Sequence, residues 1–370
     1  MKKILYIPSL NLPVYFWRIE AYANSLVKFK DRCAVHVVFL VSMSDNIAWD
    51  KICIGHGEAS QNIQQSLDSA CQFYDVIIFQ RVQFKEGIAL LRKLKEKYPK
   101  VKFIAEIDDA IGDIPPSNIN YDRFKDHHAW SAMHMLQSDA VITSTEYLKN
   151  DILRLQDEYN KEAKDKVSVP IHVAPNCVDY TSWKYKRNRK TYEELRIGYV
   201  AGAGHDEDLH IAYRAMLPIL DNDKNIRFII RYGGCIPEYF KEHPQIDFER
   251  VNWHISKYAQ ELYDLKLDIA LGPLRDTNFN RCKSNLRWLE FATLGTPIVA
   301  SAVEPFNNTK GIIYLTSNDV EDFEYTISRC INECELNGFD HKKLKKQCKQ
   351  NYNIFNECSK LLDFIDNLQD

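Results

Sequence analysis

The clearest chemical pattern in this sequence lies between Phe279 and Ser301. Lys283 and Ser284 stand at the expected start of a helix that Gly295 ends. The free N–H groups and the dipole at a helix start favour a phosphate, and Lys283 adds a positive charge there. Glu290 lies two turns further along the same face, roughly 10 Å of helix rise away. The spacing predicts a site for a diphosphate and a ribose diol, with a solvated ion pair on the helix surface as the alternative.

A second pattern comes from a glycine-containing turn at residues 202–205. An apolar run, Ile197–Val200, leads into Gly202, Gly204 and His205, and a helical stretch follows. Glycines permit a close approach of the backbone to a phosphate or a sugar, although the turn is not a complete GxGxxG motif. His205 could donate a hydrogen bond to a phosphate, or it could simply be a solvated histidine at a helix start. These three residues are therefore candidates for contact with a phosphate or a sugar.

Three carboxylates follow an apolar run that ends near residue 107. Strand alternation places Glu106 and Asp108 on one face and Asp109 on the other. A carboxylate beside a reacting sugar acts as a base or stabilises oxocarbenium charge. Asp108, Asp109 and Lys283 are therefore the candidate catalytic residues, with capping of the following loop as the structural alternative. We expect no Asp-x-Asp metal site here, and no metal or other cofactor.

Further cationic candidates follow other apolar runs. Arg18 lies one helical turn beyond the first run, and Arg81 lies just past residues 75–79. With Glu106 they are predicted to line the acceptor site or cleft; the alternatives are an interdomain ion pair for Arg18 and a structural salt bridge for Arg81. Arg231 precedes two glycines and is predicted to reach the phosphates of the donor.

The elements that must position these residues alternate between strand and helix in the first half of the chain. Near-continuous apolar strands flanked by helices indicate a parallel sheet that is covered on both faces. The predicted strands are Ile4–Pro8, Ala34–Leu40, Asp75–Phe79, Val101–Ile107, Ala140–Thr143 and Ile171–Ala174, with helices near Tyr15–Lys28, Ile63–Phe73, Lys85–Lys97 and Tyr121–Leu136.

The second half begins the same alternation again. Two doubly wound sheets in tandem direct the carboxyl ends of their strands toward a shared cleft. We predict domains at 1–182 and 195–352, a polar, basic linker at 183–194, and a C-terminal helix at 353–370 that packs back on the first domain. The predicted strands are Leu195–Val200, Ile226–Arg231, Ile246–Val251, Leu267–Leu271, Pro297–Ala300 and Gly311–Leu315, with helices at Leu209–Leu220, Lys257–Leu265, Ser284–Leu294, Glu321–Cys334 and Glu357–Leu368.

Composition limits the class of protein. The 370 residues are 45% hydrophobic and 27% charged, with a net charge of −3, which is typical of a globular chain and argues against a surface devoted to nucleic acid. No stretch is long enough for a membrane span, and the N-terminus does not resemble a signal peptide. The ten cysteines lack CxxC and zinc-type spacing, so we expect reduced thiols and a cytoplasmic location.

The run Phe279–Ser301 resembles the C-terminal signature of retaining GT-B glycosyltransferases, the group 1 or family 4-like branch. The resemblance implies two Rossmann-like domains, with Glu290 on the donor ribose and the turn at Gly202 facing the pyrophosphate. It also implies retention of the anomeric configuration. Cys282 stands where this family carries the first Glu of its Glu-x7-Glu motif, and the loop is similar to that of a branch with Asn-Arg-x-Lys-Ser. Either Asn280 or backbone N–H groups would then hold the sugar hydroxyls. Asp108 takes the place of the family's histidine.

We therefore expect a metal-independent hexosyl- or pentosyltransferase that uses a nucleoside diphosphate sugar. The alternatives are a nucleotide-sugar epimerase of GT-B fold and a non-catalytic module that binds a nucleotide or sugar. The acceptor stays open among glycan, lipid-linked glycan, protein and modified DNA, so nucleic acid enters only as an acceptor. The stretch Trp183–Lys190 suits either peripheral membrane contact or, more simply, a solvated linker. The sequence does not fix an oligomeric state.

Overall fold

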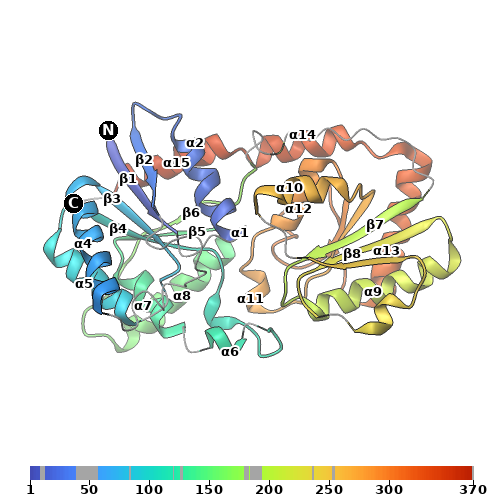
Figure 1. Ribbon diagram of the computed structural model, residues 1–370, viewed down its shortest axis with the longest axis horizontal. Helices are drawn as coiled ribbons and strands as arrows, with labels where there is room; N and C mark the ends of the chain where they lie inside the picture. The colour runs from blue at the N-terminus through green and yellow to red at the C-terminus, as the bar shows by residue number, and fades with distance from the viewer. Residues whose placement is uncertain are drawn as a thin grey trace.

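The strands of the protein form two six-stranded sheets that lie side by side along the long axis (Figure 1). This computed structural model describes residues 1–8, 13–38, 57–82, 85–119, 121–125, 128–178, 183, 194–235, 237–251 and 255–368. Every strand pair in both sheets is parallel. The predicted fold class, two doubly wound α/β sheets, is confirmed.

The first sheet has the strand order β2-β1-β3-β4-β5-β6. Its strands are buried on both faces: Ile4 and Tyr6 of β1 pack with Ile78, whereas Leu5 and Ile7 pack with Ile77 in a second cluster. The strand order reverses direction between β1 and β3, which is where doubly wound sheets bind ligands. The strands are β1 (Lys2–Ile7), β2 (Cys33–Val37), β3 (Val76–Gln80), β4 (Lys102–Ile107), β5 (Ala140–Thr143) and β6 (Ile171–Val173).

The second sheet has the order β12-β11-β10-β7-β8-β9, with its reversal between β7 and β10. Fully buried residues on alternate positions of β7 and β8 again fill both faces. The strands are β7 (Leu195–Ala201), β8 (Ile226–Tyr232), β9 (Ile246–Arg250), β10 (Ile269–Gly272), β11 (Ile298–Ser301) and β12 (Tyr314–Thr316).

Helices cover both sheets. In the first half they are α1 (Pro13–Tyr15), the π-helical η1 (Phe16–Glu20), α2 (Ala21–Leu26), α4 (Gly57–Phe73), α5 (Lys85–Lys97), the short 3-10 helix η2 (Ile111–Asp113), α6 (Tyr121–Phe124), α7 (His128–Gln137) and α8 (Glu146–Glu162). In the second half they are α9 (Asp206–Asn222), η3 (Glu238–Lys241), α10 (Ile255–Asp264), α11 (Asn278–Arg281), α12 (Leu286–Leu294), α13 (Val320–Asn332), η4 (Glu333–Gly338), α14 (His341–Asn351) and α15 (Ile354–Asp366).

Each predicted strand overlaps an observed one, although the end of the second predicted strand, residues 39–40, lies outside the described residues. The helices differ in several places, and the short helices η2, η3 and α11 were not predicted. The single helix predicted over Tyr121–Leu136 is in fact two, α6 and α7, and the charged helices α8 and α14 were not predicted. In the first helical segment of the chain, the π-helical η1 buries Trp17, Arg18 and Ile19 in succession.

One apolar cluster joins the two halves. Trp183 is the one linker residue before Glu194 that the structure describes, and its ring lies 5.7 Å from that of Trp17 and 6.5 Å from that of Tyr258. At the end of the chain α15 packs against α2, where Cys358 Sγ donates to Tyr22 O. Because residues 184–193 lie outside the described part, the exact domain limits stay a prediction.

Within the described ranges, no helix is both long and apolar enough to cross a bilayer.

Candidate active site

The segment that links α11 to α12 brings two cations to the edge of the second sheet. Lys283 Nζ lies over the ring of Phe279, 4.5 Å from its centroid, and the Arg287 guanidinium lies 5.3 Å from the ring centroid of Tyr199. No carboxylate among the described residues forms a salt bridge with either cation. Burial and the charge of Arg287 lower the pKa of Lys283, while Asp109 and Asp208 oppose that shift. Within the described part of the chain, these positive charges therefore have no carboxylate at ion-pair distance.

The start of α12 lies beside these cations. Its N-cap is Asn285, whose side chain makes no capping hydrogen bond; its amide instead donates to Thr309 Oγ1 and Tyr352 Oη. Ser284, the predicted phosphate contact, accepts a 2.7 Å hydrogen bond from Asn176 of the first half. The first amides of α12 therefore remain without a side-chain cap, as in helix termini that bind anions.

Glu290 lies on the same helix and is 8% exposed. Its carboxyl forms a hydrogen bond with Tyr258, and burial raises its pKa to about 7, against the opposing effects of Tyr258 and Arg287. A carboxylate that titrates near neutral pH at this depth is available to accept hydrogen bonds from a diol.

The glycine turn after β7 faces the same edge of the sheet. A side chain at Gly202 would meet open space, so the backbone there is accessible, whereas Gly204 has a positive φ of 91° and lies against Asn118 of the first half. The His205 Nδ1 atom lies 2.7 Å from Asp208 Oδ2. Burial lowers the pKa of His205 to about 4, so the ring is neutral at neutral pH. Because Nδ1–H donates to Asp208, the other ring nitrogen of the neutral histidine is a hydrogen-bond acceptor. In this state the ring cannot donate the hydrogen bond to a phosphate that we expected.

The acidic residues of the first half are tied to Arg81. Arg81 Nε donates to Asp108 Oδ1 at 2.5 Å and Nη2 donates to Asp109 Oδ2 at 2.7 Å. Because β4 ends at Ile107, strand alternation stops there, and both aspartates turn toward the same guanidinium instead of opposite faces. Arg81 has a left-handed φ of 51°, a costly conformation that is typical of functional sites.

Asp109 of the first half interacts electrostatically with Lys283 of the second. Burial and the neighbouring Asp108 raise its pKa, while Arg81 and Lys283 oppose that rise. Asp109 and Lys283, two candidate catalytic residues from different halves, therefore lie within electrostatic range of each other.

Arg18 and Glu106 do not line an open cleft, contrary to our expectation. Their side chains are each 1% exposed and form a buried ion pair, with Arg18 Nε 2.7 Å from Glu106 Oε1. Gln80 donates to the other carboxylate oxygen, and Arg18 also donates to Ala174 O and to Asn176 Oδ1. These residues fix the protein's own structure and are not exposed to a substrate.

Two predicted donor residues are also engaged elsewhere. Arg231 forms ion pairs with Asp247 and Glu249 on the neighbouring strand β9, and the structure does not bring it to the cations of α12. Asn280 is 8% exposed, and its amide donates to Arg275 O within the turn that precedes α11. This hydrogen bond is local, and Asn280 also lines the depression beside the glycine turn, so its role as a sugar ligand stays a prediction.

Cys282 is fully buried and packs into an apolar cluster of the first half. Phe279 enters the same cluster, which includes Ile107, Leu148 and Ile152. Thr145 Oγ1 donates to Cys282 O at 2.9 Å and also accepts from Leu148 N, so one hydroxyl caps α8 and holds this loop. The cysteine therefore has a packing role that a carboxylate at this position could not fill.

Sequence reasoning missed four residues that complete this arrangement. Asp208 and Arg287 were findable, because each lies one helical turn from a candidate, His205 or Lys283. Tyr258 and Asn176 carried no local signal, because their partners Glu290 and Ser284 are distant in sequence.

The described residues include no His, Cys, Asp and Glu group suited to a metal ion. Next to the glycine turn lies a shallow depression that residues of both halves line, with a volume of about 30 Å³ accessible to water. The first half contributes Asn118, and the second contributes Gly204, His205, Asp208 and Asn280.

The fold and these elements define a GT-B-type protein of two Rossmann-like domains. No family model matches the sequence, and no curated protein sequence matches it. The chain is similar to the Anabaena protein HepE in complex with UDP and glucose, with a TM-score of 0.65 and 10% identity over 99% of this chain and 100% of that one. It is similar to a glycosyltransferase from Rickettsia africae, with a TM-score of 0.63 and 12% identity over 99% and 98%. It is also similar to a proposed UDP-N-acetylglucosamine 2-epimerase of Listeria monocytogenes, with a TM-score of 0.57 and 12% identity over 98% and 95%.

Proposed function

We propose that this protein is a glycosyltransferase that moves a sugar from a nucleoside diphosphate sugar to an acceptor. The observation that carries the proposal is the pair of cations, Lys283 and Arg287, at a helix start without a side-chain cap and without a carboxylate partner among the described residues. Two partly buried positive charges and amides without a side-chain cap are complementary to a diphosphate. The similarity to structures solved with UDP and glucose supports the same reading.

The remaining donor contacts follow along α12 and the turn after β7. Glu290 lies about one turn inside α12, whose first residue follows shortly after Lys283, and this order suits a diphosphate at the helix start and a ribose diol further along. Gly202 leaves its backbone open for the phosphates or the sugar. Arg231, Asn280 and His205 have weaker support, because their side chains are held by other groups.

The chemistry would take place between the halves. When the bond from the anomeric carbon to the diphosphate breaks, negative charge develops on the leaving group, and Lys283 and Arg287 would stabilise it. These cations do the work that a divalent metal would otherwise do, so the proposed transfer is metal-independent. Asp109 and Asp108 would face the reacting sugar and the acceptor hydroxyl. The resemblance of the α12 segment favours retention of the anomeric configuration.

The test is donor turnover by Lys283→Ala. Lys283 lies at the leaving group, and loss of one such contact typically costs 10²- to 10³-fold in rate. Hydrolysis of UDP-glucose and other nucleotide sugars would be measured by release of the nucleoside diphosphate, with and without EDTA. Lys257→Ala, an exposed lysine of α10, is the matched control. Equal turnover by the two variants would remove Lys283 from the site, and loss of activity in EDTA would contradict the metal-independent reaction.

One observation favours a nucleotide-sugar epimerase as the second candidate. A neutral histidine paired with an aspartate, His205 and Asp208, lies within electrostatic range of Lys283 and could move a proton at the sugar. Incubation with the donor alone separates the two functions. An epimerase would return a stereoisomer of the intact nucleotide sugar, and a glycosyltransferase would release the nucleoside diphosphate.

A further inference from the structure

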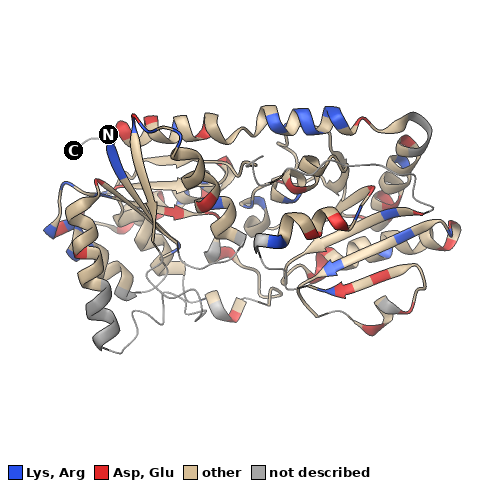
Figure 2. Ribbon diagram, turned by 45° about the horizontal axis from the view of Figure 1, so that its top comes forward, with Lys and Arg blue, Asp and Glu red and all other residues tan. Residues whose placement is uncertain are grey.

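Helix α14 carries a concentration of positive charge that the proposed reaction does not use. Its sequence, His-Lys-Lys-Leu-Lys-Lys-Gln-Cys-Lys-Gln-Asn, contains five lysines and no acidic residue. The helix packs against α12 and runs along the top of the molecule in Figure 2, where its lysines form a blue row. The whole chain has a net charge of −3, so this charge is local.

The charge pattern of α14 differs from that of the other surface helices. In α8, acidic and basic residues alternate, and Lys149 and Arg154 pair with carboxylates one turn away. By contrast, no carboxylate of the described residues pairs with Lys342, Lys343 or Lys346. An ordinary solvated helix face mixes both signs. A helix surface of a single sign is instead typical of contact with an anionic partner.

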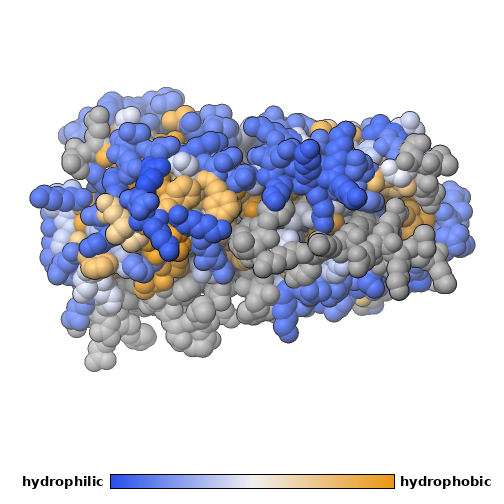
Figure 3. Space-filling model, turned by 90° about the horizontal axis from the view of Figure 1, so that it is seen from above, coloured by the Kyte–Doolittle hydropathy of each residue, from blue (hydrophilic) through white to orange (hydrophobic). Residues whose placement is uncertain are grey.

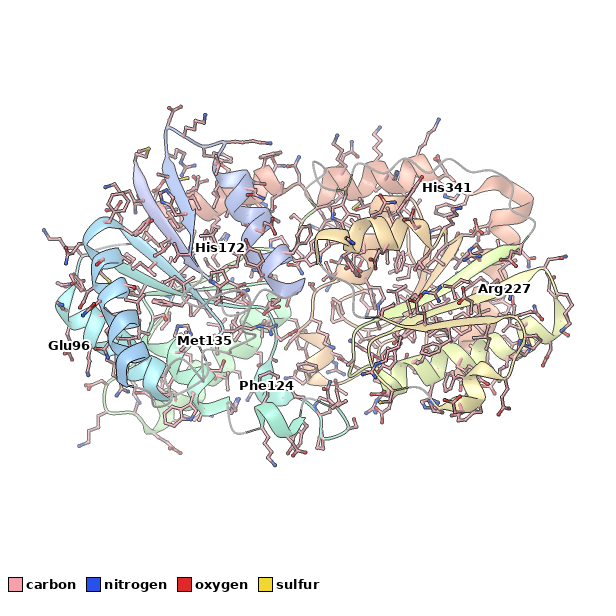
Figure 4. All side chains as sticks on the ribbon, viewed as in Figure 1. Glu96, Phe124, Met135, His172, Arg227 and His341 are labelled. Atoms are coloured by element: carbon pink, nitrogen blue, oxygen red, sulfur yellow. The ribbon has the colours of Figure 1, made fainter. Side chains whose placement is uncertain are left out.

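The packing of α14 fixes the direction of its lysines. Leu344 and Cys348 are fully buried, and His341, at the start of the helix (Figure 4), approaches Gly295 O through Nδ1 at 2.7 Å. One face of the helix is thus held along its length against the second half. Lys342, Lys343 and Lys346 lie on the opposite face and are exposed. The helix lies along the protein with these lysines directed outward.

Apolar side chains lie on the same side of the molecule. Figure 1 places α14, α15 and α2 along one long edge, and Figure 3, seen from that edge, shows an apolar group over the half that contains α2. Val27, at the end of α2, is 50% exposed. Lys28 Nζ, the next residue, lies 4.1 Å from the ring centroid of Phe355 at the start of α15. A basic surface and an exposed apolar group therefore share one face.

We propose that this face, α14 with the neighbouring end of α2, docks the protein on an anionic lipid surface. Four to eight basic residues on an amphipathic helix are characteristic of binding to anionic lipids, and apolar side chains beside them can enter the headgroup region. The proposal does not depend on the glycosyltransferase assignment.

Nucleic acid fits this face less well. The cationic side chains of α14 are lysines. The helix has no arginine, the residue that contacts base edges and phosphates through bidentate hydrogen bonds. The helix offers no aromatic side chain on which a base could stack. Because α14 is held flat against the second half, it does not project far enough to enter a major groove.

The experiment is co-sedimentation with vesicles of phosphatidylcholine mixed with phosphatidylglycerol, compared with vesicles of phosphatidylcholine alone. The wild-type chain is expected to bind the anionic vesicles at low salt and to be released as salt increases. The variant Lys342→Glu, Lys343→Glu, Lys346→Glu should bind on the order of 100-fold more weakly, since each lysine near such a surface contributes to the partition. Glutamate keeps the helix propensity, so the fold should persist.

The matched control is Lys93→Glu, Lys100→Glu, Lys161→Glu, which changes the net charge equally at exposed lysines away from α14. It should retain at least most of the vesicle binding. The proposal is overturned if the wild type does not sediment with anionic vesicles, or if both variants lose binding equally. It is also overturned if a DNA or RNA duplex binds more tightly than the vesicles and only the α14 variant loses that binding, because the face would then be a nucleic-acid surface.

Discussion

Individual side chains in the candidate site are held in charge states that favour an anionic ligand. Lys283 and Arg287 lie one helical turn apart, and each contacts an aromatic ring, while no carboxylate of the described chain pairs with them. Such an arrangement costs stability in the absence of a ligand, because the two charges repel each other in a partly desolvated place. A bound diphosphate would remove that cost, so binding and stability should be coupled.

Glu290 gives a prediction at this scale. Its pKa is about 7 in the folded chain, compared with 4.5 for an unperturbed carboxyl, so the folded state binds this proton more tightly. The contribution of this proton to the free energy of unfolding is fully present below about pH 4.5 and is lost as the pH rises through about 7. Glu290→Gln stays neutral and keeps a hydrogen-bond acceptor for Tyr258. Without a ligand, the wild type should therefore lose up to roughly 3 kcal/mol relative to the variant across this range.

Urea unfolding at a series of pH values measures this difference. The free energy of unfolding of Glu290→Gln should fall less steeply between about pH 4.5 and 7 than that of the wild type. Parallel curves for the two proteins would mean that Glu290 is not buried as an isolated carboxyl, and would weaken its assignment to the ribose.

At the scale of elements, the short helix α11 belongs to the second half in sequence but is docked in the first. Phe279 and Cys282 fill an apolar cluster between β4 and α8, and Thr145 holds the backbone of Cys282. Asp109 and Asp113 lie close enough to raise the pKa of Cys282 further, in addition to burial. Residue 282, where the resemblance of the run Phe279–Ser301 implies a glutamate, is here an apolar, acid-lined contact between the halves.

Cys282→Glu tests this interpretation. A carboxyl buried in an apolar cluster near other carboxylates should destabilise the fold by more than about 3 kcal/mol. Cys282→Ala removes only the thiol and should cost about 1–2 kcal/mol. The measurement is the free energy of unfolding from urea titrations of the three proteins. If the glutamate variant is as stable as the alanine variant, residue 282 faces an open sugar site after all.

The sequence was sufficient to predict the strands of both sheets, but it was not sufficient to predict helices with few apolar residues. Strands such as Val76–Gln80 are apolar at nearly every position, which makes their length and number readable. Helix α8 has three buried residues and α14 has two, so neither shows a strong apolar period. The sequence was also insufficient for part of the site. It showed the motif residue Glu290 of α12. It did not show that tertiary packing buries Arg18 and Glu106 between β4 and β6, so these two residues were assigned to a cleft.

At the scale of the whole molecule, polar contacts connect the core of the first half to the donor loop of the second. Gln80, Glu106, Arg18, Asn176 and Ser284 form a continuous chain of hydrogen bonds. A second bridge runs from Asn118 to Gly204 O, and a third from Thr145 to Cys282 O. These bridges end at the two loops to which we assign the donor phosphates. We infer that donor binding stabilises the association of the halves as well as the second half alone.

The most direct test of the proposed donor site is calorimetric titration with nucleoside diphosphates, each compared with its monophosphate, in EDTA. We predict that one diphosphate binds with micromolar affinity and that its monophosphate binds at least about tenfold more weakly, because it presents less charge to Lys283 and Arg287. Lys283→Ala should reduce the diphosphate affinity by about tenfold or more, and Lys257→Ala should not. Absence of binding by every nucleotide, or equal binding by the two variants, would contradict the assignment of this helix start as a nucleotide-sugar site.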